Sequence, residues 1–146
     1  MIPLMIAKEE QEIIEVFSLL DNWDDKYEYI IELGKKLPPL DKEHKVDENK
    51  IKGCQSNVWL VASYDNGKVY YKADSDSVIV KGLISLLIKV LSGKTPDEIL
   101  NCELSFIETI GLTKHLAPTR SNGLHAMIKQ IKNYALAFKL KFNSLK

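Results

Sequence analysis

The chain has 146 residues, of which 45% are hydrophobic and 27% are charged. This length and balance are typical of one globular domain that buries its core without disulfides or metals, and we expect a single domain over residues 1–146. The 20 basic residues equal the 20 acidic ones in number, so charge gives no reason to expect nucleic acid or an anionic membrane as the main partner. No basic segment precedes the first apolar residues, so we expect no signal peptide and a cytoplasmic location.

Two helices are predicted first. Apolar residues recur every three or four positions through residues 8–20, with acidic residues in the first turn. Asn22 is a suitable N-cap for a second helix at about 23–36, which a proline pair ends. The polar, aperiodic stretch 41–50 that follows predicts a surface loop.

From Val58 the apolar period changes to two, which predicts strands. Asn66-Gly67 is a strong hairpin signal, so we expect a central hairpin at about 56–74 and allow for a short third strand near 48–53. The predicted cross-strand pairs are Asp65–Lys68, Tyr64–Val69, Ala62–Tyr71 and Leu60–Ala73.

Further helices are predicted after the hairpin. The apolar stretch 78–91 is too short and too charged to span a bilayer, so it predicts a buried core helix capped by Ser77. The other predicted helices are 96–101, which opens with a capping box, 104–112, and 121–138. The expected fold class is therefore α+β, with a small antiparallel sheet packed by helices.

The two cysteines, Cys54 and Cys102, stand in no Cys-x-x-Cys or Cys/His cluster, so we expect no metal site and two free thiols, with a single disulfide as the alternative. Gly53 precedes Cys54 at the mouth of the hairpin, where a loop can present a nucleophile. Free cysteine is also among the most buried residue types, so the sequence pattern leaves both interpretations open. No histidine lies near Cys54 in the sequence to serve as its base.

Four segments, in order, resemble the SufE family of sulfur acceptors. They are NWDDKYEYIIELGKKLPPL, IKGCQSNVWL, DSDSVIVKGLISLL and LTKHLAPTRSNGLHAMI. The resemblance implies a fold similar to the SufE/IscU type and a role in iron–sulfur cluster assembly. It implies that the protein takes a persulfide onto Cys54 from a SufS-type cysteine desulfurase and stimulates that enzyme. The protein would then pass the sulfur to a SufBCD-type scaffold complex.

The resemblance also implies that the protein needs no cofactor of its own, because the pyridoxal phosphate belongs to the desulfurase. No nucleic acid or membrane partner is expected, and self-association into a homodimer is left open. Because a persulfide is easily oxidised or reduced, we expect Cys54 to be largely buried at rest, on a loop that moves outward when the desulfurase binds.

Six more residues are expected to bind the partner or support the cysteine loop: Gly53, Gln55, Ser56, Asp74, Asp76 and Arg120. Arg120 is the only arginine of the chain. It has either a structural role, as a salt bridge or a clamp on backbone carbonyls at the start of the last helix, or a role near the cysteine loop or the desulfurase interface. Asp74 and Asp76 precede a helix, where they would interact with its dipole or tune the loop. Cys102 lies outside the four segments and is interpreted as a core residue.

Three alternatives compete with this interpretation. An iron–sulfur scaffold would need three cysteine ligands, and the thiol count argues against it. An acceptor that serves a different desulfurase would have the same sequence features. A non-catalytic adaptor would bind and activate a desulfurase without using its thiol.

Overall fold

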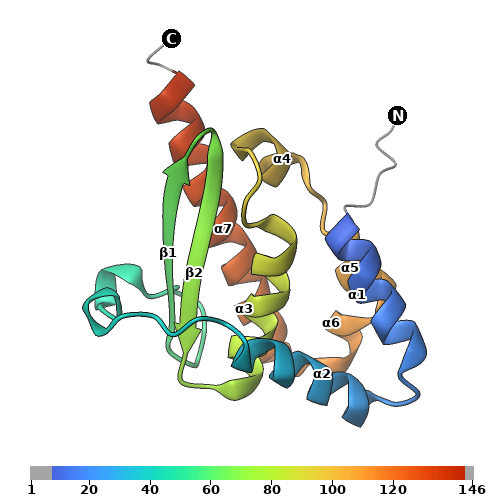
Figure 1. Cartoon of the computed structure of the whole chain (residues 1–146). Helices are drawn as coiled ribbons and strands as arrows, with labels where there is room; N and C mark the ends of the chain where they lie inside the picture. Colours follow the sequence, from blue (N-terminus) through green and yellow to red (C-terminus); the bar gives the residue numbers. More distant parts are fainter. Residues whose placement is uncertain (1–7, 144–146) are drawn as a thin grey trace.

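The sheet is a hairpin of β1 (Val58–Asp65) and β2 (Lys68–Ser75) in a computed structural model that describes residues 8–143 (Figure 1). All four predicted cross-strand pairs are present. Asn66 and Gly67 form the turn with φ of 52° and 83°, as a two-residue turn that follows the strand twist requires. The inner face, which includes Leu60 and Val69, is buried because apolar side chains alternate along both strands.

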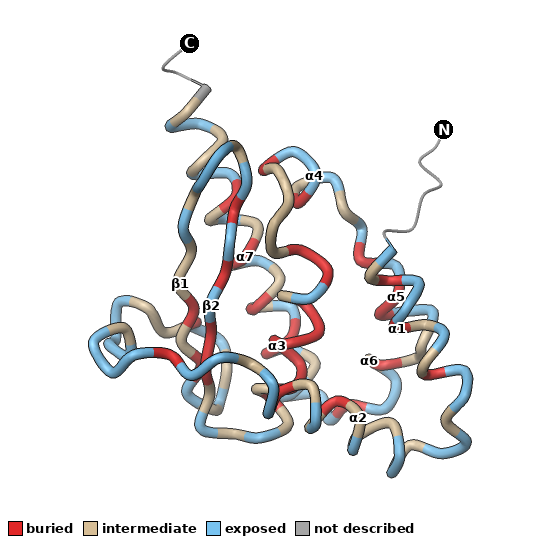
Figure 2. Tube along the Cα trace, in the orientation of Figure 1, coloured by how far each residue is buried: buried red, intermediate tan, exposed pale blue. Residues whose placement is uncertain are grey.

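Helix α3 (Val78–Leu91) is the centre of the core, and most of its residues are buried (Figure 2). The Ser77 hydroxyl caps it by accepting a hydrogen bond from the Val80 N–H. Helix α2 (Trp23–Lys35), capped by Asn22, packs closely across α3. A Cβ on Gly82 would lie 2.3 Å from the Ile30 carbonyl oxygen, so only glycine permits this approach.

Helix α7 (Pro118–Asn143) lies behind the hairpin (Figure 1). The Tyr71 hydroxyl donates to the Ile131 carbonyl at 2.7 Å, and the Tyr64 ring stacks on Phe142 at 4.2 Å. These contacts fix the hairpin against α7. Helix α4 (Pro96–Asn101), which opens with the predicted capping box, also packs against α7.

Helix α1 (Lys8–Leu19) lies on the side of the molecule away from the hairpin (Figure 1). The buried Glu10 carboxylate accepts the Phe106 N–H at 3.1 Å and so joins α1 to α5 (Ser105–Thr109). Among the described helices none is both long and apolar enough to cross a membrane. The fold is α+β, as the sequence predicts.

Three predicted elements are wrong in detail. No third strand forms near 48–53, because a short 3-10 turn, η2 (Asp47–Asn49), leaves only an isolated bridge between Lys50 and Trp59. A similar turn, η1 (Lys42–His44), precedes it. The polar stretch 41–50 is otherwise largely exposed, as expected.

The single helix predicted at 104–112 is two helices, α5 and α6 (Leu112–His115). Gly111 separates them because its φ of 73° is incompatible with a continuous helix. The last helix, predicted at 121–138, is α7 and is longer at both ends. The helix can begin at Pro118 because the first turn needs no N–H donor from that residue. At its other end, Phe142 is held by stacking on Tyr64.

Candidate functional site

Residues 51–58 form a short loop that carries Cys54 between the polar stretch and the hairpin. Its neck is closed because the Ile51 N–H donates to the Val58 carbonyl at 2.8 Å. Gly53 has φ of 94°, and a Cβ there would lie 3.2 Å from the Ala126 side chain of α7. The loop therefore folds back onto α7, and glycine is required at its closest approach.

The Cys54 side chain lies between this loop and α7. Its Sγ donates to the Gly123 carbonyl at 3.6 Å, and a Cβ on Gly123 would lie at ordinary contact distance from the sulfur, 3.5 Å. Cys54 is partly buried and packs against the core, which agrees in direction with the expectation of a largely buried thiol. Burial raises the pKa of the Cys54 thiol above its ordinary value, which keeps it protonated at neutral pH.

A cavity of about 60 Å³ opens beside the thiol. It is lined by Cys54, Gln55, Ser56, Val80, Thr119, Arg120, Gly123 and Met127. Four of the sequence candidates, Cys54, Gln55, Ser56 and Arg120, therefore meet at one cavity. No histidine and no carboxylate is among these lining residues, so Cys54 has no adjacent side-chain base there.

Arg120 is exposed at the start of α7. Its guanidinium makes no ion pair or hydrogen bond with any other described residue, so the structural salt bridge that the sequence left open is not present. The charge of Arg120 is thus available to a group that enters the cavity or docks over it.

Asp76 supports the far end of the cysteine loop. Its carboxylate accepts from the Asn57 backbone N–H at 3.1 Å and from the Asn57 side-chain amide at 2.8 Å. The Ser75 hydroxyl donates to the Asn57 carbonyl at 2.7 Å. These three bonds fix Asn57 to the segment between β2 and α3.

Asp74 is buried away from the cavity and joins three elements. Its carboxylate pairs with Lys45 of the polar stretch at 2.9 Å and with Lys81 of α3 at 3.3 Å, and it accepts the Ser75 N–H. Burial alone would raise the pKa of Asp74, but the hydrogen bonds from Lys45 and Ser75 and the charge of Lys81 outweigh it and lower the pKa. Asp74 therefore secures the polar stretch and does not face Cys54.

Cys102 occupies a different environment, after α4. Its Sγ donates to the Glu10 carboxylate at 3.7 Å, and its carbonyl accepts from the Lys132 ammonium at 2.6 Å. Burial, together with the nearby Glu10, raises the pKa of this thiol. Both cysteines are free, and Cys102 does not line the Cys54 cavity.

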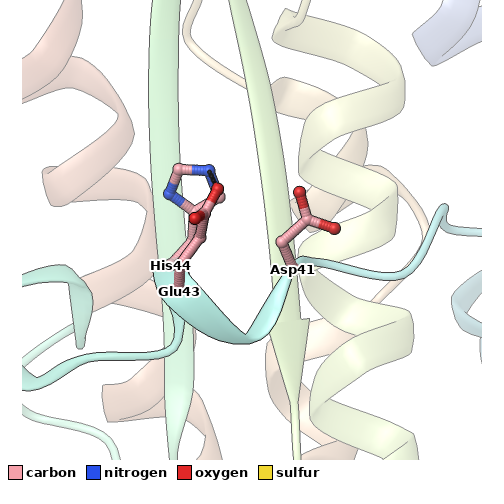
Figure 3. Close-up of side chains that lie close together, drawn as sticks. All are labelled: Asp41, Glu43 and His44. Atoms are coloured by element: carbon pink, nitrogen blue, oxygen red, sulfur yellow. Dashed lines mark ion pairs between the residues drawn. The ribbon is translucent and has the colours of Figure 1, made fainter.

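One group of side chains in the described part of the chain could hold a metal ion. Asp41, Glu43 and His44 lie on and beside the turn η1, in front of the hairpin, with donor atoms within 4.8 Å of one another (Figure 3). Asp41 and Glu43 are exposed, and neither cysteine belongs to the group. It is therefore separate from the chemistry of the Cys54 cavity.

Several residues of the site were not singled out from the sequence. Val80, Thr119, Gly123 and Met127 come from α3 and α7 and reach Cys54 only through the fold. Thr119 and Gly123 flank Arg120 in the sequence TRSNG, which is the signal that could have indicated them.

The family model described as "SufE: Fe-S metabolism associated domain" matches residues 11–135. An uncharacterized SufE-like protein of Synechocystis is 42% identical over 128 residues, which are 88% of this chain and 80% of that protein. Another, from Rhizobium meliloti, is 40% identical over 129 residues, 85% of this chain and 92% of its own length. The chain belongs to the SufE family, which is associated with iron–sulfur metabolism.

Two further comparisons agree. "SufE-like protein 1, chloroplastic/mitochondrial" of Arabidopsis thaliana is 44% identical over 132 residues, which are 90% of this chain but 36% of the plant protein. The solution structure of a hypothetical protein from Thermus thermophilus superimposes with a TM-score of 0.75 at 22% identity. That superposition covers 91% of this chain and 97% of the other, and it supports the fold.

Proposed function

We propose that the protein is a sulfur acceptor that takes a persulfide from a pyridoxal-phosphate cysteine desulfurase onto Cys54. In doing so it stimulates the desulfurase, and it then passes the sulfur to an iron–sulfur scaffold of the SufBCD type. The observation that carries the proposal is a single thiol at a small cavity, on a short loop that lies against α7, in a chain of the SufE family.

The proposed chemistry is an exchange between sulfur atoms. The Cys54 thiolate attacks the outer sulfur of the desulfurase persulfide and forms a new S–S bond, and the old S–S bond breaks. The electron pair of that bond leaves with the desulfurase cysteine as a thiolate, and the proton that Cys54 loses balances the one that this thiolate takes up, so nothing is oxidised or reduced overall. Such an exchange needs an accessible thiolate and no general acid, and the residues that line the cavity include no histidine or carboxylate that could act as one.

The residues around Cys54 have distinct proposed roles. Gly53 gives the loop its bend, and Gln55 and Ser56 line the cavity that would shelter the persulfide. Arg120 would attract the anionic sulfur or a carboxylate of the partner. Asp76 holds one end of the loop and Asp74 holds the polar stretch behind it.

The proposal extends to the state of the protein in the cell. We expect one domain over residues 1–146, a cytoplasmic location and no resident cofactor, since the pyridoxal phosphate chemistry belongs to the desulfurase. A scaffold function is disfavoured because Cys102 lies outside the Cys54 cavity, so the two thiols do not form a cluster-binding set.

The test is persulfide formation followed by mass spectrometry. After incubation with a SufS-type desulfurase and free cysteine, the peptide that contains Cys54 should gain the mass of one sulfur atom. The variant Cys54→Ser should accept none, whereas Cys102→Ser should accept as much as the wild type. Stimulation of the desulfurase by Cys54→Ser equal to that by the wild type would support the adaptor alternative instead.

A further inference from the structure

Charge is distributed unevenly over this neutral chain. Helix α7 has five basic residues and no acidic residue in its 26 positions. Helices α1 and α2 have four acidic residues each and only three lysines between them. Helix α7 is also the element on which the cysteine loop rests, so the basic side of the molecule includes Cys54.

A second hollow borders the cysteine loop further along α7. It has a volume of about 400 Å³ and lies between the polar stretch and the helix. Its lining residues are Glu48, Lys50, Ile51, Lys52, Ala126, Lys129, Gln130 and Asn133. Ala126, which lies against Gly53 of the loop, lines this hollow, and its neighbour Met127 lines the Cys54 cavity.

Three cations around the loop have no internal partner. Lys52, Arg120 and Lys129 are all exposed, and none forms an ion pair or side-chain hydrogen bond within the described residues. Other lysines of the same region are engaged, since Lys50 pairs with Asp47 at 3.3 Å and Lys132 bonds to a carbonyl.

The nearby carboxylates compensate only part of this charge. Asp47 is paired with Lys50, and both oxygens of Asp76 accept hydrogen bonds from Asn57. Glu48 is the remaining acid that lines the hollow. Among the described residues, three cations without an ion-pair partner thus face two carboxylates without one, Glu48 and Asp76, because hydrogen bonds from the neutral Asn57 leave the charge of Asp76 in place.

We propose that Lys52, Arg120 and Lys129 form a basic docking face, which binds acidic side chains at the entrance of the desulfurase active site. The inference rests on the proposed function, because it names the chemistry of the partner surface that receives Cys54. Cations on both sides of the loop would orient the thiol toward that entrance. Complementary charge of this kind raises the rate of association and selects the partner more than it adds contact area.

The experiment measures binding of the protein to a SufS-type desulfurase by isothermal titration at low and high salt. The double variant Lys52→Glu/Lys129→Glu leaves Cys54 and Arg120 in place and removes no internal contact. Its Kd should rise about tenfold or more at low salt, and the difference should shrink at high salt because exposed charges are screened.

The matched control is Lys72→Glu, which reverses an exposed lysine of β2 that also lacks an ion pair among the described residues. It should bind like the wild type. A double variant that binds as tightly as the wild type, or a control that is weakened as much, overturns the docking face. A wild-type protein that does not bind the desulfurase at all also overturns it.

A separate readout distinguishes the docking face from the proposed function. At saturating desulfurase, Cys54 of the double variant should gain one sulfur as in the wild type. If wild-type Cys54 gains no sulfur although the desulfurase binds, the sulfur-acceptor proposal fails, and the binding data alone decide on the docking face.

Discussion

The Cys54 thiol is kept neutral by its position and not by a charged partner. The polar group that it contacts is the Gly123 carbonyl, which accepts a hydrogen bond from S–H and would repel a thiolate. Together with burial, this contact makes the resting thiol a weak nucleophile, because only the thiolate attacks sulfur. A thiol in this state reacts slowly with electrophiles until its surroundings change.

The two glycines beside the thiol should respond differently to the same substitution. Gly53→Ala forces a side chain into a left-handed φ of 94° and against Ala126, and it should lower the free energy of unfolding by about 1–2 kcal/mol. Gly123→Ala places a Cβ at ordinary contact distance, 3.5 Å from Sγ, within a helix that favours alanine. Its unfolding free energy should stay within about 1 kcal/mol of the wild type.

The same pair of variants should change the reactivity of Cys54 in opposite directions. Alkylation should be faster in Gly53→Ala, because the loop is pushed off α7, and slower in Gly123→Ala, because the new methyl covers the sulfur. Urea unfolding and alkylation rates, both in a Cys102→Ser background, provide the measurements. Equal effects of the two substitutions would show that the loop does not rest on α7 as described.

At the scale of elements, Asp74 is the main connection between the polar stretch, the hairpin and α3. Asp74→Asn removes the charge that Lys45 and Lys81 share and should destabilise the protein by about 1–3 kcal/mol at neutral pH. The pKa of Asp74 is lower in the folded protein than in the unfolded chain, where it is about 3.9. The charged carboxylate therefore stabilises the fold fully above the unfolded-state pKa, and this stabilisation is lost as pH falls through the folded-state pKa.

The difference in unfolding free energy between wild type and Asp74→Asn should therefore be largest near neutral pH and shrink in acid. Urea titrations at several pH values measure it, and the exposed Asp21→Asn serves as the control that should show little difference. A difference that stays constant down to the most acidic pH would mean that the charge of Asp74 does not stabilise the fold.

Local sequence patterns were sufficient where an element is defined by its own residues. The hairpin register follows from alternation and the Asn66-Gly67 turn, and the capping box at Thr95 follows from its spacing. The break at Gly111 and the extension of α7 to Phe142 were missed, since a left-handed residue and a distant ring contact decide them.

The site was predictable to a similar extent. The pattern around Gly53 left the role of Cys54 open, and the resemblance to the SufE family indicated it as the site cysteine. Arg120 was noticed as the only arginine, and the same resemblance favoured a place near the cysteine loop. Gly123 and Met127 were not indicated, because their distance from Cys54 in the sequence hides a contact that only the packing of the loop on α7 creates.

At the scale of the whole molecule, the fold offers a rigid base with one weakly held segment. Helices α3 and α7 fix the two sides of the Cys54 cavity, and the loop is closed at its neck by the Ile51–Val58 hydrogen bond. Among the described residues, one side-chain hydrogen bond joins residues 52–56 to α7, the 3.6 Å bond of Cys54, and Gly53 lies close to Ala126. Few contacts would be lost if residues 52–56 moved outward while the core stayed unchanged.

We therefore expect the desulfurase to shift this loop to an outward state. Cys54 should react slowly with a small alkylating reagent in the free protein and about tenfold faster when bound to a desulfurase whose own reactive cysteine has been replaced, because binding favours the exposed thiol. Cys102→Ser removes the second thiol from the measurement.

Amide hydrogen exchange of the bound protein should rise at residues 52–56 but not at Ile51, whose N–H closes the neck of the loop. Equal alkylation rates in the two states would mean that the loop is already in its reactive position, and exchange that rises at Ile51 as well would mean that the whole neck opens.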